Sequence, residues 1–279
     1  MIFRKIYYAL SPEMRINVRK LVYFPIDAFE SLTNKRNKNV PKKGDIFIGS
    51  GDFIGQGIHQ VQLLTEFSNL KADSKILDVG SGIGRTAVAL KTFLSDKGTY
   101  DGFDVVEKGV LWCQNNISAN YKNFTFKYVP LSTDLYSLAN EKADVFTFPY
   151  QNDSFDTIFL FSVFTHMQLL EVQNYLNEIQ RVLKTGGECL STFFIYNENE
   201  ELIIADKNYK FPFPYKKQGF RLMNEKVPSA NIAFSEEKLR EMAKVSNLSI
   251  VKKVNGTWKN TPENESLRDF QDVIVLRKN

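Results

Sequence analysis

Residues that build metal sites and disulfide frameworks are scarce in this chain. Its 279 residues include two cysteines, two histidines and two tryptophans. Cys113 and Cys189 have neither a metal-ligand spacing nor the spacing of a disulfide framework. No cluster of His and Asp at ligand spacing appears, so we expect no metal site. The low cysteine content excludes a small disulfide-stapled domain and fits a reducing cytoplasm.

Long hydrophobic runs are also missing. No run approaches 18 apolar residues, so we expect no transmembrane helix. The N-terminus lacks a continuous apolar core followed by a small-residue cleavage site, which argues against a signal peptide. With 43% apolar and 24% charged residues, the composition is that of an ordinary globular protein, which we expect in the cytoplasm.

Excess charge is small overall but unevenly distributed. A net charge of +4 is too mild to indicate nucleic-acid binding. Residues 1–45 hold ten basic and four acidic residues, a net +6, which leaves −2 for the rest of the chain. Apolar residues recur there at helical spacing, and Pro25 is expected to break or kink the helix. We interpret residues 1–43 as a basic amphipathic extension that either packs on the core or contacts a partner protein or the inner membrane surface.

The most informative stretch is KILDVGSGIGRTAVAL, residues 75–90. A short apolar strand is followed by three glycines at alternate positions, Gly80, Gly82 and Gly84, and then by a helical run. Glycine allows a tight turn and a close approach of ligand to backbone, and the helix N-terminus offers free N–H groups. This pattern is typical of a nucleotide-binding loop.

Two residues distinguish the type of nucleotide. A dinucleotide fingerprint requires a third glycine where this chain has Arg85. Asp78 ends the strand and would repel a pyrophosphate but attract a cationic amino-acid group. Further on, strand 99–105 ends at Asp104, where a carboxylate can accept hydrogen bonds from both ribose hydroxyls. An N-cap role for Asp104 is the alternative.

This loop resembles motif I of the class I S-adenosylmethionine-dependent methyltransferases, and the likeness extends over residues 44–195. The loop SVFTHM, residues 162–167, and the run LNEIQRVLKTGG, residues 176–187, are similar to those of bacterial methyltransferases of surface-glycan or secondary-metabolite clusters. The resemblance implies that S-adenosylmethionine is the cofactor, with the glycines under its methionine part and Asp78 near its amino group.

The same resemblance places the adenine in one of two positions. The run ADVFTFPYQNDSFD, residues 143–156, is similar to the family's adenine pocket and nominates Asp144 and Val145. Asp134 and Leu135, closer to the end of strand 124–129, are the alternative. The expected cofactor-binding residues are Asp78, Gly80, Ser81, Gly82, Gly84, Arg85, Phe103, Asp104, Val105, Asp134, Leu135, Asp144, Val145, Phe161 and Phe53.

Catalytic groups are few. Methyl transfer from a sulfonium needs alignment and exclusion of water more than strong acids or bases. For a hydroxyl acceptor a base is needed, and His166, after strand 156–161, is the candidate; orienting Thr165 or capping the next helix is its alternative role. His59 is interpreted as a surface or lid-packing residue. The Gly-rich segment 44–57 is expected to form a lid, with Phe53 near the sulfonium.

The pattern of alternating strands and helices predicts an α/β Rossmann-like, doubly wound, seven-stranded sheet. It is expected to be mostly parallel with an antiparallel C-terminal strand, preceded by the helical extension. The methyltransferase domain would span 44–279. Within it, residues 196–234 form an aromatic-rich insertion, either for substrate binding or as a satellite core.

Three functions compete. The first is O-methylation of a small-molecule or glycan-linked acceptor. The second is a nicotinamide-dependent oxidoreductase, against which Arg85 and Asp78 argue. The third is a non-catalytic scaffold that retains the cofactor pocket and docks on a partner or membrane through its basic extension. The acceptor and the oligomeric state are open at this point.

Overall fold

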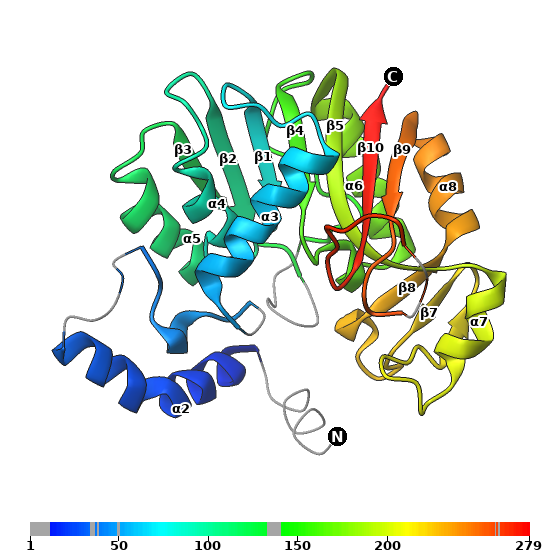
Figure 1. The fold of residues 1–279 in the computed structure, drawn as a ribbon, viewed down its shortest axis with the longest axis horizontal. Coiled ribbons are helices and arrows are strands. Elements are labelled where there is room, and N and C mark those ends of the chain that lie inside the picture. Colours follow the sequence, from blue (N-terminus) through cyan, green and yellow to red (C-terminus); the bar gives the residue numbers. More distant parts are fainter. Residues whose placement is uncertain are drawn as a thin grey trace.

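The computed structural model describes residues 12–33, 37, 39–48, 51–132, 141–259, 261 and 263–279. Seven strands form the central sheet in the order β3-β2-β1-β4-β5-β10-β9 (Figure 1). They are β1 (Lys75–Val79), β2 (Thr99–Asp104), β3 (Phe124–Tyr128), β4 (Phe155–Leu160), β5 (Leu183–Tyr196), β9 (Leu248–Val254) and β10 (Asp272–Lys278). β1 to β5 are parallel, and β10 runs antiparallel to both of its neighbours. The expected seven-stranded, mostly parallel sheet is therefore confirmed.

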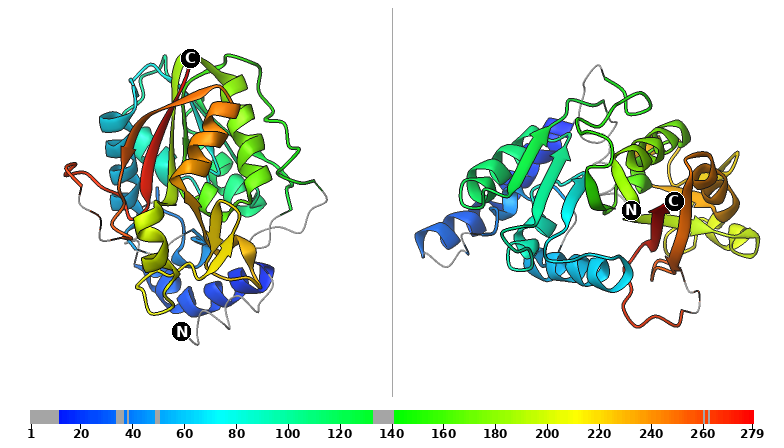
Figure 2. Two further views of the ribbon diagram at one scale, coloured as in Figure 1. Left: turned by 90° about the vertical axis from the view of Figure 1, so that its right-hand side faces the viewer. Right: turned by 90° about the horizontal axis from the view of Figure 1, so that it is seen from above.

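Helices cover both faces of this sheet. They are α3 (Phe53–Phe67), α4 (Arg85–Leu90), α5 (Glu107–Cys113), which continues into the π-helical η2 (Gln114–Ser118), α6 (Leu169–Val182) and α8 (Glu236–Val245). Alternate residues of β1 point to opposite faces. Leu77 and Val79 join the core cluster that includes α6 and α8, while Ile76 joins the cluster of α3, α4 and α5. Figure 2, seen from above, shows α3 and α6 on either side of the strands.

Some boundaries differ from expectation. α3 begins at Phe53, because Asp52 caps it through a hydrogen bond from the Ile54 N–H at 3.1 Å, so part of the expected lid is helix. α6 ends at Val182, because Leu183 is already extended and starts β5.

The insertion adds a second, small sheet to the long strand β5. Its elements are α7 (Glu198–Ala205), β6 (Tyr215–Lys217), β7 (Phe220–Leu222), η4 (Pro228–Ala230) and β8 (Ile232–Ser235). β8 pairs in parallel with the carboxyl end of β5, Phe194 to Tyr196. Because β8 pairs with β5, the strands of the insertion continue the central sheet, which has ten strands among the described residues.

Aromatic residues of the insertion build a satellite core rather than an open ring surface. Phe211 and Phe213 pack with Phe194 and Trp258, and the ring centroids of Phe194 and Trp258 lie 5.2 Å apart. Trp258 and Phe213 are fully buried. Of the two roles left open for this insertion, the packing of these rings corresponds to a satellite core.

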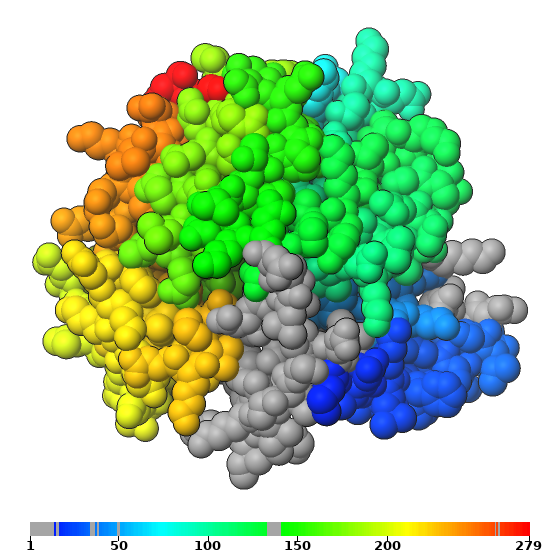
Figure 3. All heavy atoms as spheres, turned by 180° about the vertical axis from the view of Figure 1, so that it is seen from behind, coloured from blue at the N-terminus to red at the C-terminus, as the bar shows by residue number. Residues whose placement is uncertain are grey.

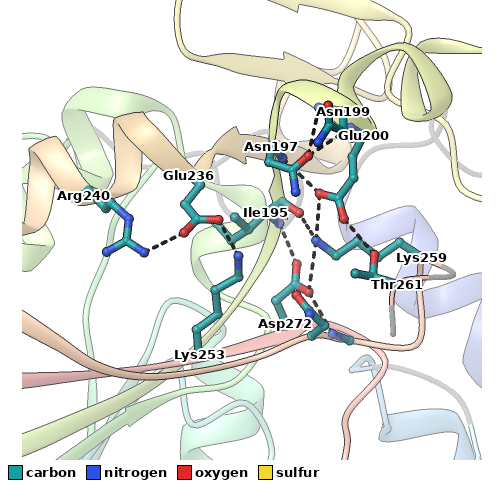
Figure 4. A network of polar contacts seen from close by, with 12 residues as sticks. Ile195, Asn197, Asn199, Glu200, Glu236, Arg240, Lys253, Lys259, Thr261 and Asp272 are labelled. Atoms are coloured by element: carbon teal, nitrogen blue, oxygen red, sulfur yellow. Dashed lines mark hydrogen bonds and ion pairs between the residues drawn. The ribbon is translucent and has the colours of Figure 1, made fainter. Parts of the chain in front are cut away.

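A buried polar network holds the insertion to the central sheet (Figure 4). The Asp272 carboxylate, fully buried in β10, accepts hydrogen bonds from the Ile195 N–H at 2.7 Å and the Trp258 Nε1–H at 2.8 Å. Lys259 Nζ donates to the Ile195 carbonyl at 2.7 Å and lies 3.1 Å from Glu200 Oε2. A buried charge needs such partners, so the network fixes how β5, α7 and the 255–271 loop meet.

In the described part of the N-terminal extension, the helix α2 (Pro12–Leu32) is followed by the short η1 (Lys43–Asp45). Pro25, expected to break or kink the helix, lies inside α2 without ending it. Figures 1 and 2 show α2 at the end of the molecule to which the carboxyl ends of the parallel strands point. In the described part of the chain, no helix is long and apolar enough to cross a bilayer.

The turn after β1 provides a stability test. Gly84 has φ +76°, and a Cβ there would lie 2.8 Å from Cys113 Sγ and 2.9 Å from Ile117 Cδ1. We expect Gly84→Ala to lower the free energy of unfolding by roughly 2–4 kcal/mol, through left-handed strain plus overpacking. Gly186→Ala is the matched control, because Gly186 has φ +77° with nothing within 4 Å of the added Cβ. Urea unfolding should show strain alone, about 1 kcal/mol, for the control; equal losses for both variants would contradict the packing argument.

Candidate active site

A cavity of about 580 Å³ opens at the carboxyl ends of β1, β2 and β4. In a parallel sheet, ligands bind at this edge, where the strand order reverses between β1 and β4. The volume lies within the range of small-molecule sites. The wall includes Asp78, Gly80, Ser81, Arg85, Phe103, Asp104, Val105, Phe161 and His166 among the residues expected from the sequence.

The glycine turn is fixed by the next strand. The N–H groups of Gly80 and Ser81 both donate to the Phe103 carbonyl, at 2.9 and 3.0 Å. Gly80 has φ +80°, and a Cβ there would lie 2.5 Å from Val163 Cγ2. Glycine is therefore required at this position by both backbone conformation and space.

Asp104 takes a structural part in the same turn. Its two carboxylate oxygens accept hydrogen bonds from the Gly82 N–H at 2.7 Å and the Val106 N–H at 2.8 Å. Burial raises the pKa of Asp104 to about 6, although the backbone N–H groups work in the opposite direction. The side chain lines the cavity and at the same time ties β2 to the glycine turn.

Asp78 is the most strongly perturbed acid of the cavity. It is buried, and its Oδ2 accepts a hydrogen bond from the Tyr100 hydroxyl at 2.5 Å. Burial raises the pKa of Asp78 to about 8, the Tyr100 hydrogen bond opposes this shift, and the charge of Asp104 adds to it. A carboxyl group of this kind is poised to ionise when a cation enters.

Several polar atoms on the cavity wall have no hydrogen-bond partner among the described residues. They are Ser81 Oγ, Arg85 Nε and Gln168 Nε2. Arg85 is held by a hydrogen bond from its Nη2 to the Ile48 carbonyl at 2.8 Å, and burial lowers the pKa of its guanidinium. Together with the acids, these atoms offer donors and negative charge to a polar ligand. A cofactor with a cationic amine, a carboxylate and hydroxyl groups fits this donor and acceptor set.

His166 lies in η3 (Phe164–His166), directly after β4, and is half-buried on the cavity wall. Its Nδ1 is 2.8 Å from the Ser229 carbonyl oxygen of the insertion. Because a carbonyl only accepts, Nδ1 carries a proton and the neutral ring keeps its lone pair on Nε2. Burial lowers the pKa of His166, partly offset by backbone hydrogen bonds with Ser229 and Ala230. The lowered pKa favours the neutral form of the ring.

Some expected residues lie elsewhere. Phe53 is buried in the core at the start of α3 and does not line the cavity; Phe47 and Ile48 of the same expected lid do. Asp144 and Val145 also lie off the cavity wall, with Val145 71% exposed, although the adjacent Ala143 lines it. Gly82 and Gly84 belong to the turn, where both have positive φ, but they do not line the cavity. The alternative adenine residues Asp134 and Leu135 lie outside the described residues.

The structure adds residues that the sequence pattern did not indicate. From α6 and the residue before it come Gln168, Glu171 and Tyr175, and the insertion and the segment before β10 contribute Ser229 and Gln271. Ser162, at φ +60°, donates from its hydroxyl to Gln271 Oε1 at 3.1 Å. The apolar positions of α6 indicated its buried face, but no local signal relates residues 162 and 271, which meet only in the tertiary structure.

His59 pairs with an acid outside the cavity. Its Nε2 lies 3.6 Å from Asp269 Oδ2, and the hydrogen bond with Asp269 raises its pKa. It does not line the cavity. Among the described residues, no three His, Cys, Asp or Glu side chains are grouped to hold a metal ion.

Sheet order, glycine turn and acids at the ends of β1 and β2 together define a class I S-adenosylmethionine-dependent methyltransferase fold. The methyltransferase domain family matches residues 70–247 of the chain, and the chain belongs to that family. S-adenosylmethionine is accordingly the cofactor that the class implies.

Curated relatives match only in part. The chain is 31% identical over 114 residues to an arsenite methyltransferase of Mus musculus. The matched residues cover 41% of this chain and 29% of that protein. It is 26% identical over 156 residues to a ubiquinone/menaquinone biosynthesis C-methyltransferase of Wigglesworthia glossinidia brevipalpis, covering 54% and 55%. The matched region is thus about a third to a half of these relatives' length.

Solved structures support the fold. A S-adenosylmethionine-dependent methyltransferase of Methanosarcina mazei aligns with a TM-score of 0.51 at 22% identity, covering 75% of this chain and 94% of that one. A Pyrococcus horikoshii protein aligns with a TM-score of 0.54 at 14% identity, covering 84% and 95%. A complex of the Haloferax volcanii Trm112 methyltransferase activator with a methyltransferase gives 0.52 at 14% identity, covering 80% and 90%.

The raised pKa of Asp78 predicts how stability depends on pH. A carboxyl group whose pKa is higher in the folded than in the unfolded chain binds more protons when folded. Stability therefore falls as the pH rises from the unfolded pKa to the folded pKa. Between about pH 6.5 and 8, we expect the free energy of unfolding of the ligand-free protein to fall by up to about 1.4 kcal/mol per pH unit.

Asp78→Asn should flatten most of this slope in urea unfolding at several pH values. The Asn amide oxygen still accepts the Tyr100 hydrogen bond but does not titrate in this range. His59, whose pKa is also raised, contributes a decline of the same sign that the variant leaves in place. A slope unchanged by Asp78→Asn would show that Asp78 ionises normally in the folded chain.

Proposed function

We propose that the chain transfers a methyl group from S-adenosylmethionine to an oxygen of a small-molecule or glycan-linked acceptor, with His166 as the base. The observation that carries the proposal is the position of His166 on the cavity wall with its Nδ1–H on the Ser229 carbonyl. This contact orients the ring and leaves Nε2 as the proton acceptor. The related arsenite and C-methyltransferases act on other atoms, so the choice of oxygen rests on this histidine.

In this proposal the cofactor occupies the space between the glycine turn and the acids. Asp78, once ionised, holds its amino group, and Asp104 accepts from its ribose hydroxyls with the lone pairs that the Gly82 and Val106 N–H groups leave available. Ser81 Oγ and Arg85 Nε supply donors that have no partner within the part of the chain that the structure describes. Phe103 and Phe161 add aromatic wall near the same space.

The protein's part in the reaction is positioning and proton removal. Bound S-adenosylmethionine supplies a methyl group already activated by its sulfonium. The walls align the acceptor oxygen with that methyl group and exclude water. As the carbon–oxygen bond forms and the methyl–sulfur bond breaks, leaving S-adenosylhomocysteine, the hydroxyl proton would pass to Nε2 of the neutral His166 imidazole.

The insertion supplies the acceptor side in this proposal. Pro228 and Ser229 of η4 line the cavity, and Ser229 also fixes His166. The basic N-terminal segment adds a contact to a membrane surface or a partner protein. A scaffold that binds the cofactor without turnover is the second candidate, because buried acids at β1 and β2 require only binding.

Cofactor choice is tested by calorimetric titration with S-adenosylhomocysteine beside NAD. We expect micromolar binding of the first and none of the second, because the turn lacks the dinucleotide glycine and carries Asp78 instead. Asp78→Asn should weaken S-adenosylhomocysteine binding roughly tenfold or more through loss of a charge-assisted hydrogen bond. Binding of NAD alone would refute the assignment of the glycine turn.

Catalysis is tested by His166→Ala in a methyl-transfer assay against a panel of nucleotide sugars, glycans and phenols. We expect turnover to fall roughly 10²–10⁴-fold, as for loss of a general base, with cofactor affinity unchanged. The pH profile of kcat should rise through a pKa below that of free histidine, because burial lowers the pKa of His166.

His59→Ala is the matched control, since His59 pairs with Asp269 away from the cavity, and its turnover should equal that of the unmodified chain. Equal losses of turnover and cofactor affinity in His166→Ala would contradict its role as a base. Cofactor binding without transfer to any acceptor class would favour the scaffold.

A further inference from the structure

The N-terminal helix α2 carries its apolar side chains on the side turned to solvent. Its stripe comprises Met14, Val18, Leu21, Val22, Pro25, Phe29 and Leu32, which recur at intervals of three and four residues and so share one face. All of these side chains are exposed, Leu21 by 77% and Leu32 by 86%. No charged residue interrupts the stripe along the helix, which spans about 30 Å at 1.5 Å per residue.

The polar face of α2, by contrast, holds the helix to the chain that follows. The buried Asp27 carboxylate accepts hydrogen bonds from the Lys43 N–H at 2.7 Å and the Gly44 N–H at 2.9 Å. Lys20 forms an ion pair with Asp45 at 3.0 Å. A surface helix normally buries its apolar stripe and exposes its charges; this one is oriented the other way by a set of specific contacts.

A second observation is the charge of this part of the chain. Residues 1–45 carry a net charge of +6, whereas the remaining residues carry −2. Within α2, three basic residues balance three acidic ones, so the excess positive charge lies in the stretches before and after the helix. An apolar stripe flanked by basic stretches is complementary to an anionic lipid surface, where apolar side chains enter the acyl boundary and Lys and Arg meet headgroups.

The position of α2 relates this surface to the cavity. Beyond η1 the chain reaches Phe47 and Ile48, both on the cavity wall. Figures 1 and 2 show α2 at the carboxyl end of the parallel strands, and Figure 3 shows α2 (blue) and the insertion (yellow) at this same end of the molecule. A surface in contact with α2 would therefore lie at the end of the molecule where the cavity opens.

We propose that α2 is an interfacial anchor that lies flat on an anionic membrane surface, with its apolar stripe in the headgroup region. Asp27 and Lys20 keep the stripe pointing away from the protein, so docking turns the cavity end toward the lipid. This anchoring does not depend on which methyl acceptor the chain uses.

The test is co-sedimentation of the full chain with vesicles of phosphatidylcholine, alone or mixed with phosphatidylglycerol. We expect binding to the anionic vesicles, weaker binding to the neutral ones, and a fall in binding as salt screens the lysines. The double variant Leu21→Glu, Phe29→Glu should reduce binding roughly tenfold or more, because two apolar side chains that would enter the headgroup region are replaced by anions.

Val245→Glu is the matched control, since Val245 is 64% exposed at the end of α8, away from α2. It should bind anionic vesicles like the unmodified chain, and thermal unfolding should confirm that all variants fold. No binding to anionic vesicles, or equal binding by the stripe variant, would overturn the proposal. A concentration-dependent dimer that the stripe variant converts to monomer, without vesicle binding, would assign the stripe to a second copy of the chain and also overturn it.

Discussion

The carboxyl end of β2 holds the glycine turn, and the site depends on this contact. The Phe103 carbonyl accepts hydrogen bonds from the N–H groups of Gly80 and Ser81, and the Asp104 carboxylate accepts one from the Gly82 N–H. These bonds join two adjacent parallel strands just where the sheet order changes direction. The turn exists because backbone donors after β1 meet acceptors at the end of β2, and because glycine permits the left-handed conformations that this requires.

The two aspartates of the cavity, at the ends of β1 and β2, show how one environment gives different properties to the same functional group. Asp104 accepts two backbone N–H groups and its pKa rises only to about 6. Asp78 accepts a hydrogen bond from the Tyr100 hydroxyl, and its pKa rises to about 8. Both are buried, so the difference follows from the smaller number of donors to Asp78 and from the charge of Asp104, which raises the pKa of Asp78 further. The acid with fewer donors is the one best suited to respond to a cation.

The insertion and the helix α2 frame the cavity end in different ways. The insertion is attached by a buried aromatic core and by the Asp272–Lys259 network, so it is an integral part of the sheet. It places Ser229 against His166. Helix α2 is attached through polar contacts of its inner face and leaves its apolar face uncovered. One element completes the wall of the site, and the other offers a surface to the outside.

The sequence by itself determined the sheet, the glycine turn and its two flanking acids. These follow from local patterns: apolar strands, glycine spacing and helical periodicity act between near neighbours in the chain. The position of His166 after β4 made it the candidate base, and His59 was interpreted as a surface or lid-packing residue.

Only the tertiary structure decided which side chains face the cavity. Phe53 was expected there, but Asp52 starts a helix that turns the ring into the core. Aromatic rings of the insertion pack into a satellite core, because the insertion must bury apolar surface of its own to offset the entropy cost of ordering it. The contacts of His166 with Ser229, and of Ser162 with Gln271, join residues 63 and 109 positions apart. Such pairings, like the outward direction of the α2 stripe, depend on how distant segments pack, and no spacing within the sequence encodes them.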